Sequence, residues 1–262
     1  QRCAHELWAR RLSSWNALMV GYAKQGYSHD ALDCLDRMRN ECISPDAITF
    51  SGVLKACGDI RSIQEGSRIH EEIVSIGLLE KSIMVGNALV NMYAKCGMIL
   101  KAQQLLEHLP VQDVVSWSIL MSRYTQLGGH GHKALHCLER MQAEGLSPDA
   151  FTLSCPLKVC GRIRGLAKGE QIPDNILKRG GLSKESIVVG TALVDMYGKC
   201  SMLAKAQQLH DRLYTQDVAT WTALISGYAQ EGQGQEALRC FEQMQDVGIL
   251  PNLATFVCIL KA

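Results

Sequence analysis

Hydrophobic residues recur at helical spacing in short stretches of the chain, and glycine- or proline-containing segments separate these stretches. Within residues 12–46, one apolar helical face consists of Trp15, Leu18, Met19 and Tyr22. Gly26 ends this pattern, a second apolar stripe occupies residues 29–39, and Pro45 stops it. The pattern predicts two antiparallel helices joined by a short turn.

The same pattern returns along the chain. VGNALVNMYAKCG at residues 85–97 comes back 104 residues later as VGTALVDMYGKCS. WNALMVGYAKQG, which starts at Trp15, has counterparts that start at Trp117 and Trp221. We therefore expect a repeat array, in which each hairpin buries its apolar face against its neighbours.

Cutting after the recurring SPD and LPN motifs and at equivalent points gives three repeat types in rotation. The first type comprises residues 12–46, 114–149 and 218–252, the second type 47–82 and 150–186, and the third type 83–113 and 187–217. Partial repeats at 1–11 and 253–262 indicate a fragment of a longer array. The fold prediction is all-α: a solenoid of about seven full antiparallel hairpins plus partial ends.

The composition and charge of the chain exclude few classes of function. The net charge is +1, and 47% of the residues are hydrophobic. No apolar run approaches the roughly 18 residues that a membrane span needs, and no secretory signal is visible, so no membrane partner is expected. A nucleic-acid binder usually has a basic balance, so any such function here must depend on where the charges lie.

Seven of the eleven cysteines form sets that follow the repeat register. Equivalent positions hold Cys34, Cys137 and Cys240, then Cys57 and Cys160, then Cys96 and Cys200. Cysteine on the apolar face of a repeat behaves as a small hydrophobic residue, and no C-x-x-C pair is present. We expect buried, reduced thiols in a reducing compartment.

Two polar positions also follow the register, the fifth and the last residue of each repeat. In the first- and third-type repeats these are Asn16 with Asp46, Asn87 with Asp113, Ser118 with Asp149, Thr191 with Asp217, and Thr222 with Asn252. Asp or Asn at the last position also suits a helix N-cap. Capping does not explain the fifth position, where Asn, Ser and Thr are mediocre helix formers.

The alternation of 35-, 36- and 31-residue units resembles pentatricopeptide repeats of the mixed long-and-short (PLS) subclass, over essentially all 262 residues. The motifs that carry this resemblance are WNALMVGYAKQG, TFSGVLKACG with Ile69-His70, and VGNALVNMYAKCG. Tetratricopeptide repeats, which run at about 34 residues and usually hold peptides, are the competing family. The pentatricopeptide resemblance implies a right-handed solenoid that binds single-stranded RNA, one base per repeat.

The resemblance also implies a pairing rule for the fifth and last residues: Asn with Asp reads U, Thr or Ser with Asp reads G, and Thr with Asn reads A. The chemistry agrees, because a carboxylate accepts the ring N–H of uracil or guanine whereas Asn can donate to adenine. The second-type pairs, Ser51 with Ser82 and Ser154 with Ser186, are base-reading positions without an assigned base. The predicted target is 5′-U-n-U-G-n-G-A-3′; Arg11, at the end of the first partial repeat, leaves its base open.

Stacking and phosphate contacts are expected beside the edge contacts. The second residues of the repeats are Ser13, Ile48, Met84, Val115, Phe151, Val188, Ala219 and Ala254. We assign Met84, Val115 and Val188 to base stacking, with ordinary interface packing as the alternative. Lys24, Lys95 and Lys199 share the thirteenth position, and Lys55, Lys158 and Lys261 share the ninth position of the second type. These lysines predict a phosphate-tracking stripe, with a solvated helix end as the alternative.

Motifs with a catalytic appearance are incomplete. His70 and Glu72 match the H-x-E of nucleobase deaminases but lack its P-C-x-x-C partner. The cluster His130, His132 and His136, and the segment Gly232-Gln-Gly234, are interpreted as turns. We expect no enzyme activity, metal or cofactor. The resemblance implies the recognition module of a mitochondrial or chloroplast RNA-processing factor for C-to-U editing, acting with editing-complex partners, or a stabilisation or splicing factor.

Overall fold

The computed structural model describes residues 2–127, 130–165, 184–213 and 215–262, with side chains of 2–10 and 184–186 excepted. Two compact units divide the chain, Gln1–Arg123 and Tyr124–Ala262. Every regular element in the described ranges is a helix, so the predicted all-α class is confirmed. None of these helices has the length and hydrophobicity needed to span a bilayer.

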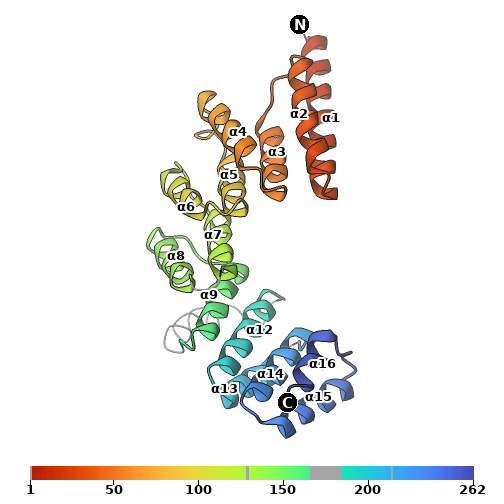
Figure 1. Ribbon diagram of the computed structural model, residues 1–262, viewed down its shortest axis with the longest axis vertical. Coiled ribbons are helices and arrows are strands. Elements are labelled where there is room, and N and C mark those ends of the chain that lie inside the picture. Colours follow the sequence, from red (N-terminus) through yellow and green to blue (C-terminus); the bar gives the residue numbers. More distant parts are fainter. Residues whose placement is uncertain (1, 128–129, 166–183, 214) are drawn as a thin grey trace. The chain divides into compact units, whose positions relative to one another are not determined.

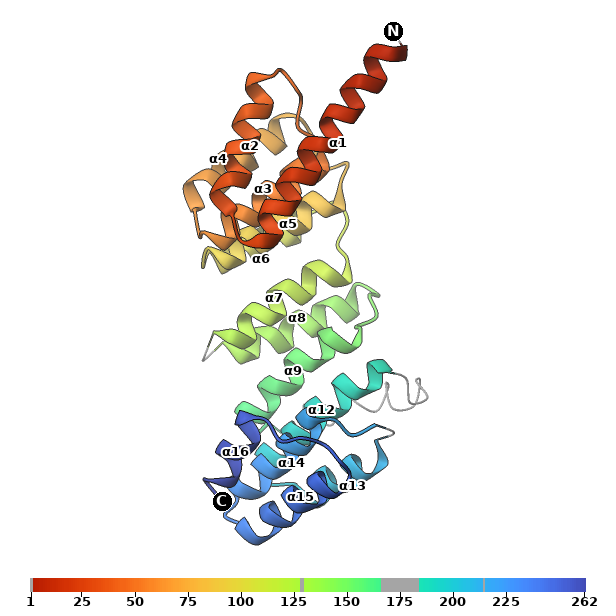
Figure 2. The same cartoon turned by 90° about the vertical axis from the view of Figure 1, so that its right-hand side faces the viewer.

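The helices of the first unit pair into hairpins (Figure 1). They are α1 (Arg2–Gln25), α2 (Ser28–Asn40), α3 (Ala47–Asp59), α4 (Ile63–Ser75), α5 (Ile83–Lys95), α6 (Ile99–His108) and α7 (Val114–Gln126), the last of which reaches the unit boundary. α1, α3 and α5 pack in succession and form one layer, while α2 and α4 each pack against their own first helix and the next one. The first helices therefore share one face (Figure 2).

The second unit repeats this arrangement. Its helices are α8 (Gly131–Ala143), α9 (Ala150–Arg162), α12 (Lys184–Lys199), α13 (Leu203–Arg212), α14 (Val218–Gln230), α15 (Gly234–Asp246) and α16 (Leu253–Ile259). Helices α9, α12, α14 and α16 pack in succession, with α13 and α15 beside them. The stacked hairpins bury residues such as Val194, Leu224 and Met244 in one apolar cluster.

Helix α1 crosses a predicted repeat boundary. The sequence places a repeat boundary between Arg11 and Leu12, and α1 runs through it without interruption from Arg2 to Gln25. The equivalent segment in the third-type repeat, HLPVQD, contains a proline and a capping Asp that end one helix and start the next. ELWARR at residues 6–11 has neither, so the helix continues.

The cysteine prediction is confirmed for the burial of two register sets. Cys34, Cys137 and Cys240 are buried, as are Cys57 and Cys160, and all described cysteines are free thiols. Burial raises the pKa of the Cys57 thiol to about 12 and that of Cys240 to about 11. Cys96 and Cys200 are only half-buried. High thiol pKa values suppress thiolate chemistry, so the buried set acts as packing.

Candidate nucleic-acid interface

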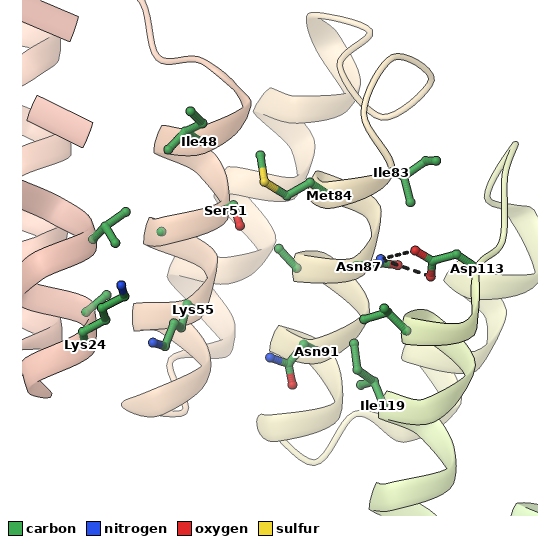
Figure 3. Close-up of a pocket in the computed structure, with 15 residues that line it drawn as sticks. Lys24, Ile48, Ser51, Lys55, Ile83, Met84, Asn87, Asn91, Asp113 and Ile119 are labelled. Atoms are coloured by element: carbon green, nitrogen blue, oxygen red, sulfur yellow. Dashed lines mark hydrogen bonds between the residues drawn. The ribbon is translucent and has the colours of Figure 1, made fainter. Parts of the chain in front are cut away.

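The first helices of the first unit line a pocket of about 640 Å³. Figure 3 shows that side chains from successive repeats enter it from one face. Among the predicted site residues, the lining includes Lys24, Ser51, Lys55, Met84, Asn87, Asp113 and Val115. Sequence reasoning missed Ile83, Asn91 and Ile119, which also line it. Asn91 occupies the register position of Lys55, so alignment of the repeats could have found it.

The two Asn–Asp pairs are joined by hydrogen bonds within the protein. The Asn87 amide nitrogen donates to both carboxylate oxygens of Asp113, at 3.1 and 3.0 Å. The Asn16 amide makes the same contacts with Asp46, at 3.0 and 3.1 Å. Fifth and last residues, distant in sequence, therefore form one polar unit in both repeats. Asn87 is half-buried and lines the pocket, whereas Asn16 is only 7% exposed.

The hydroxyl residues at the fifth position bond to their own helix. Oγ of Ser118 donates to the Val114 carbonyl at 2.6 Å, and the hydroxyls of Thr191 and Thr222 donate to the carbonyls four residues earlier at 2.8 and 2.6 Å. Such back-bonding fixes the side-chain rotamer. Because the hydroxyl is the donor in this bond, its oxygen can still accept a hydrogen bond. Thr191 and Thr222 stay half-exposed, whereas Ser118 and the second-type Ser154 are buried.

The last residues cap helices, as the alternative interpretation required. One side-chain oxygen of Asp46, Asp113, Asp149, Asp217 and Asn252 accepts the backbone N–H three residues later, at 2.7–3.0 Å. A carboxylate has about four lone-pair sites, so one capping bond does not exhaust it. Asp149, Asp217 and Asn252 are exposed, and capping and base contact are compatible roles.

The second-type last residues differ. Ser82 occupies the N-cap of α5, but its side chain makes no capping hydrogen bond. The Ser186 side chain lies outside the described residues. Ser51 lines the pocket and is half-buried. The Ser51–Ser82 position therefore lacks the hydrogen-bonded pair that marks Asn87 and Asp113.

The second residues of the repeats are exposed rather than packed. Exposed fractions are 44% for Met84, 55% for Val115 and 47% for Val188, with similar values for Ile48 and Phe151. Ser13, Ala219 and Ala254 are exposed as well. The alternative was that these side chains are buried between repeats, and their exposure contradicts it. Solvent-facing apolar side chains of this kind can pack against the faces of bases, and Phe151 among them offers an aromatic ring for stacking.

The lysines fall into two groups. Lys95 forms an ion pair with Asp59, and Lys199 contacts Asp195 at 2.6 Å, so both have acidic partners. Lys24 and the ninth-position residues Lys55, Lys158 and Lys261 are exposed and make no ion pair within the described part of the chain. Lys24 and Lys55 line the pocket from neighbouring helices (Figure 3). Their charge is available to an anionic ligand.

The motifs with a catalytic appearance find structural explanations. Nδ1 of His70 lies 2.8 Å from the Tyr93 hydroxyl, and burial lowers the His70 pKa. The interpretation of the histidine cluster as a turn is wrong for His132 and His136, which lie exposed on α8. The described residues contain no group of His, Cys, Asp and Glu suited to a metal. Gly232, at φ +70°, forms the turn between α14 and α15, as predicted.

Comparison with protein-family models gives matches to the PPR repeat family at residues 11–59 and 216–262 and to the PPR repeat at residues 87–113. The chain is 36% identical over 254 residues to a pentatricopeptide repeat-containing protein of Arabidopsis thaliana, covering 97% of this chain and 34% of the relative. Two further Arabidopsis relatives, a mitochondrial and a chloroplastic protein, are 34% and 36% identical over 96% and 98% of the chain. The chain spans about a third to a half of these relatives (34%, 36% and 48%).

Among solved structures, the chain is similar to the pentatricopeptide repeat protein PPR10 in complex with an 18-nucleotide psaJ RNA element. The TM-score is 0.73 at 20% sequence identity, and the match covers 95% of this chain and 37% of PPR10. A second crystal structure, of PPR10 from maize, matches with a TM-score of 0.57 at 22% identity, over 99% of this chain and 44% of that one. At these identities, the likeness supports the fold.

Proposed function

The chain belongs to the pentatricopeptide repeat family, and from that premise we propose that it binds single-stranded RNA with one base per repeat. The observation that carries the proposal is the Asn87–Asp113 pair in the pocket wall, whose lining also includes the exposed side chains of Met84 and Val115. A base held between two apolar side chains would place its Watson–Crick edge against this pair. PPR10, whose fold is similar, forms a complex with an RNA element, which supports RNA as the ligand of this chain.

The polarity of the Asn–Asp pair favours uracil. The carboxylate of Asp113 offers an acceptor to uracil N3–H, and the second amide hydrogen of Asn87 offers a donor to a uracil carbonyl. Cytosine presents an acceptor at N3, which would face the carboxylate lone pairs. Short hydroxyl residues such as Thr191 and Thr222 leave room for a purine. The proposed target is therefore 5′-U-n-U-G-n-G-A-3′.

We assign recognition, and no chemical step, to these repeats. The relatives named mitochondrial and chloroplastic support an organellar protein, and the mixed repeat lengths support the PLS subclass. Within an organelle, the array would bring an RNA-processing activity, C-to-U editing first among them, to its site. RNA stabilisation or splicing would use the same contacts.

A gel-shift assay with the 262-residue chain tests the proposal. The predicted RNA should bind more tightly than the same nucleotides scrambled, by roughly 1–3 kcal/mol for each well-formed base contact that the scrambled RNA cannot make. Equal affinities would indicate a merely electrostatic groove. A failure to bind either RNA would favour a protein-binding scaffold of the tetratricopeptide type.

Lys24 and Lys55, which form no ion pair among the described residues, should determine the salt dependence of binding. Replacing either by Ala should reduce the slope of log K against log salt by about 0.7 for each phosphate that is no longer neutralised, for all RNAs alike. Fluorescence anisotropy over a salt series measures this slope. Lys81 is an exposed lysine outside the pocket lining, so Lys81→Ala removes the same charge as a control. An equal change in the control would assign the effect to net charge instead.

A further inference from the structure

A buried hydroxyl follows every repeat that ends in Asp or Asn. It is the third residue of the next repeat: Thr49 after Asp46, Ser116 after Asp113, Thr152 after Asp149, Thr220 after Asp217 and Thr255 after Asn252. All five are 0% exposed. The second-type repeats end in Ser, and the third residues after them are Val85 and Val189, also buried. The hydroxyl and the acidic or amide last residue therefore occur together.

In the first unit, Thr49 connects both members of an Asn–Asp pair. Its Oγ1 lies 2.6 Å from Oδ1 of Asn16 and 2.9 Å from Oδ1 of Asp46. It also accepts the backbone N–H of Asp46 at 3.2 Å, which completes a capping box. The fifth residue, the last residue and this hydroxyl thus form a closed hydrogen-bonded triad.

Thr255 does the same in the second unit. Its Oγ1 lies 2.8 Å from the hydroxyl of Thr222, the fifth residue, and 3.0 Å from Oδ1 of Asn252, the last residue. The hydroxyls of Ser116 and Thr220 are oriented differently. Each donates to the backbone carbonyl of the last residue, Asp113 or Asp217, at 2.8 Å. Each also lies 3.0 Å from Oδ1 of that same residue. The hydroxyl touches the last residue in every case.

The different orientations of the Thr49 and Ser116 hydroxyls change the hydrogen bonding of the fifth residue. With Ser116 turned to the Asp113 carbonyl, Oδ1 of Asn87 is buried without a hydrogen-bond partner in the described structure. In the repeat of Asn16 the corresponding oxygen is bonded to Thr49. In the repeat of Asn16, the third-position hydroxyl therefore gives the amide oxygen of the fifth residue a hydrogen-bond partner that Asn87 lacks in the described structure.

We propose that this third-position hydroxyl is a positioning residue for base recognition, acting through the fifth and last residues of the preceding repeat. The inference rests on the proposed RNA-binding function. Because Thr49 donates to Oδ1 of Asn16, the amide nitrogen of Asn16 faces Asp46. The second hydrogen on that nitrogen then points away from the carboxylate of Asp46. The donor of Asn16 and the acceptor of Asp46 then form a fixed array for uracil. Where valine replaces the hydroxyl, as at Val85, the serine pair lacks this support and reads no particular base.

Thr49→Val tests the proposal because it keeps the side-chain volume and the backbone N–H that Asp46 caps. The measured quantity is the ratio of affinities for U and C at the first base of the predicted RNA. This ratio should fall roughly three- to tenfold, in line with one net hydrogen bond. Thr49→Ser keeps the hydroxyl and should retain most of the ratio. The U-to-C ratio at the third base, read by Asn87 and Asp113, should not change in either variant.

The third-base ratio and a thermal melt separate recognition from folding. A variant that only destabilises the array would lower affinity for both bases and leave the first-base ratio intact. An unchanged first-base ratio in Thr49→Val, or an equal fall in Thr49→Ser, would overturn the proposal. If the unaltered chain discriminates at neither base, the proposed function itself has failed.

Discussion

Replacing Asn252 by Asp is expected to change the base that the repeat 218–252 prefers from A to G. The discrimination should shift by roughly 1–3 kcal/mol, the range for a well-formed polar base contact. The physical reason is the loss of the amide donor, which suits adenine N1, and the gain of a carboxylate acceptor, which suits guanine N1–H. Competition binding with RNAs that differ only at the last base measures the shift.

The fold should tolerate this change. Oδ1 of Asn252 caps α16 by accepting the Thr255 N–H at 3.0 Å, and Asp217 makes the equivalent bond to Thr220 at 2.8 Å in the same kind of capping box. Asp and Asn are about equally good N-caps. Asn252 is exposed, so the new charge is not buried. An altered base preference would therefore not reflect misfolding.

Asp217→Asn is the matched reverse substitution. Both repeats have Thr at the fifth position, and the hydroxyls of Thr191 and Thr222 bond to their own helices in the same way. The sixth base should change from G to A, and the double variant should exchange the two preferences. If neither single variant alters its base, the last residue does not read RNA in this chain, whatever the affinity of the array.

Much of this architecture follows from the sequence because each repeat carries its own boundary signals. Helices α3, α5, α7 and α14 begin at the first residue after a recurring Asp or Ser, where Asp46, Asp113 and Asp217 cap α3, α7 and α14. Apolar stripes at constant spacing then fix the pairing of helices. Two predicted repeat boundaries lie inside helices. Helix α1 runs through Arg11, where the sequence lacks both proline and a capping side chain, and α12 begins at Lys184, before the boundary placed after Ser186.

The details of the candidate site depend on distances between helices, which a single sequence does not give. The alignment identified Asn16 and Asp46 as a pair, but not their direct hydrogen bonds or the 7% exposure of Asn16. Equivalent lysines also proved unequal, because Asp59 and Asp195 lie beside Lys95 and Lys199. By contrast, the third-position hydroxyls were visible in the register and could have been found there.

Replacing His210 by Leu is expected to stabilise the chain by about 1–3 kcal/mol at neutral pH, the usual cost of a buried polar atom without a partner. The His210 side chain is 0% exposed, its Nε2 has no hydrogen-bond partner in the described structure, and its ring lies 4.2 Å from that of Trp221. The equivalent residue in the other third-type repeat is Leu106, which is also fully buried. Urea or thermal unfolding measures the gain.

The gain should increase as the pH is lowered. Burial lowers the His210 pKa below its ordinary 6.5, against the weaker opposing effect of Asp211. The unfolded chain therefore takes up this proton first, and the unaltered protein loses stability as the pH falls from about 6.5 towards the lower folded pKa. The Leu variant lacks this loss, so the two unfolding curves should separate further at pH 5 than at pH 7.5. His70, whose pKa is also lowered, contributes equally to both proteins and cancels in the difference.

Leu106→His, the reverse substitution in the first unit, should destabilise the chain and do so more strongly at pH 5, because it buries an imidazole where the existing packing is apolar. Together the two variants show whether the pH-dependent loss of stability comes from burying an imidazole or from the particular surroundings of residue 210. A stability gain in His210→Leu that is the same at pH 5 and pH 7.5 would mean that His210 is already accessible to protons in the folded chain. A loss of stability at neutral pH would mean that its ring contact with Trp221 outweighs the unpaired nitrogen.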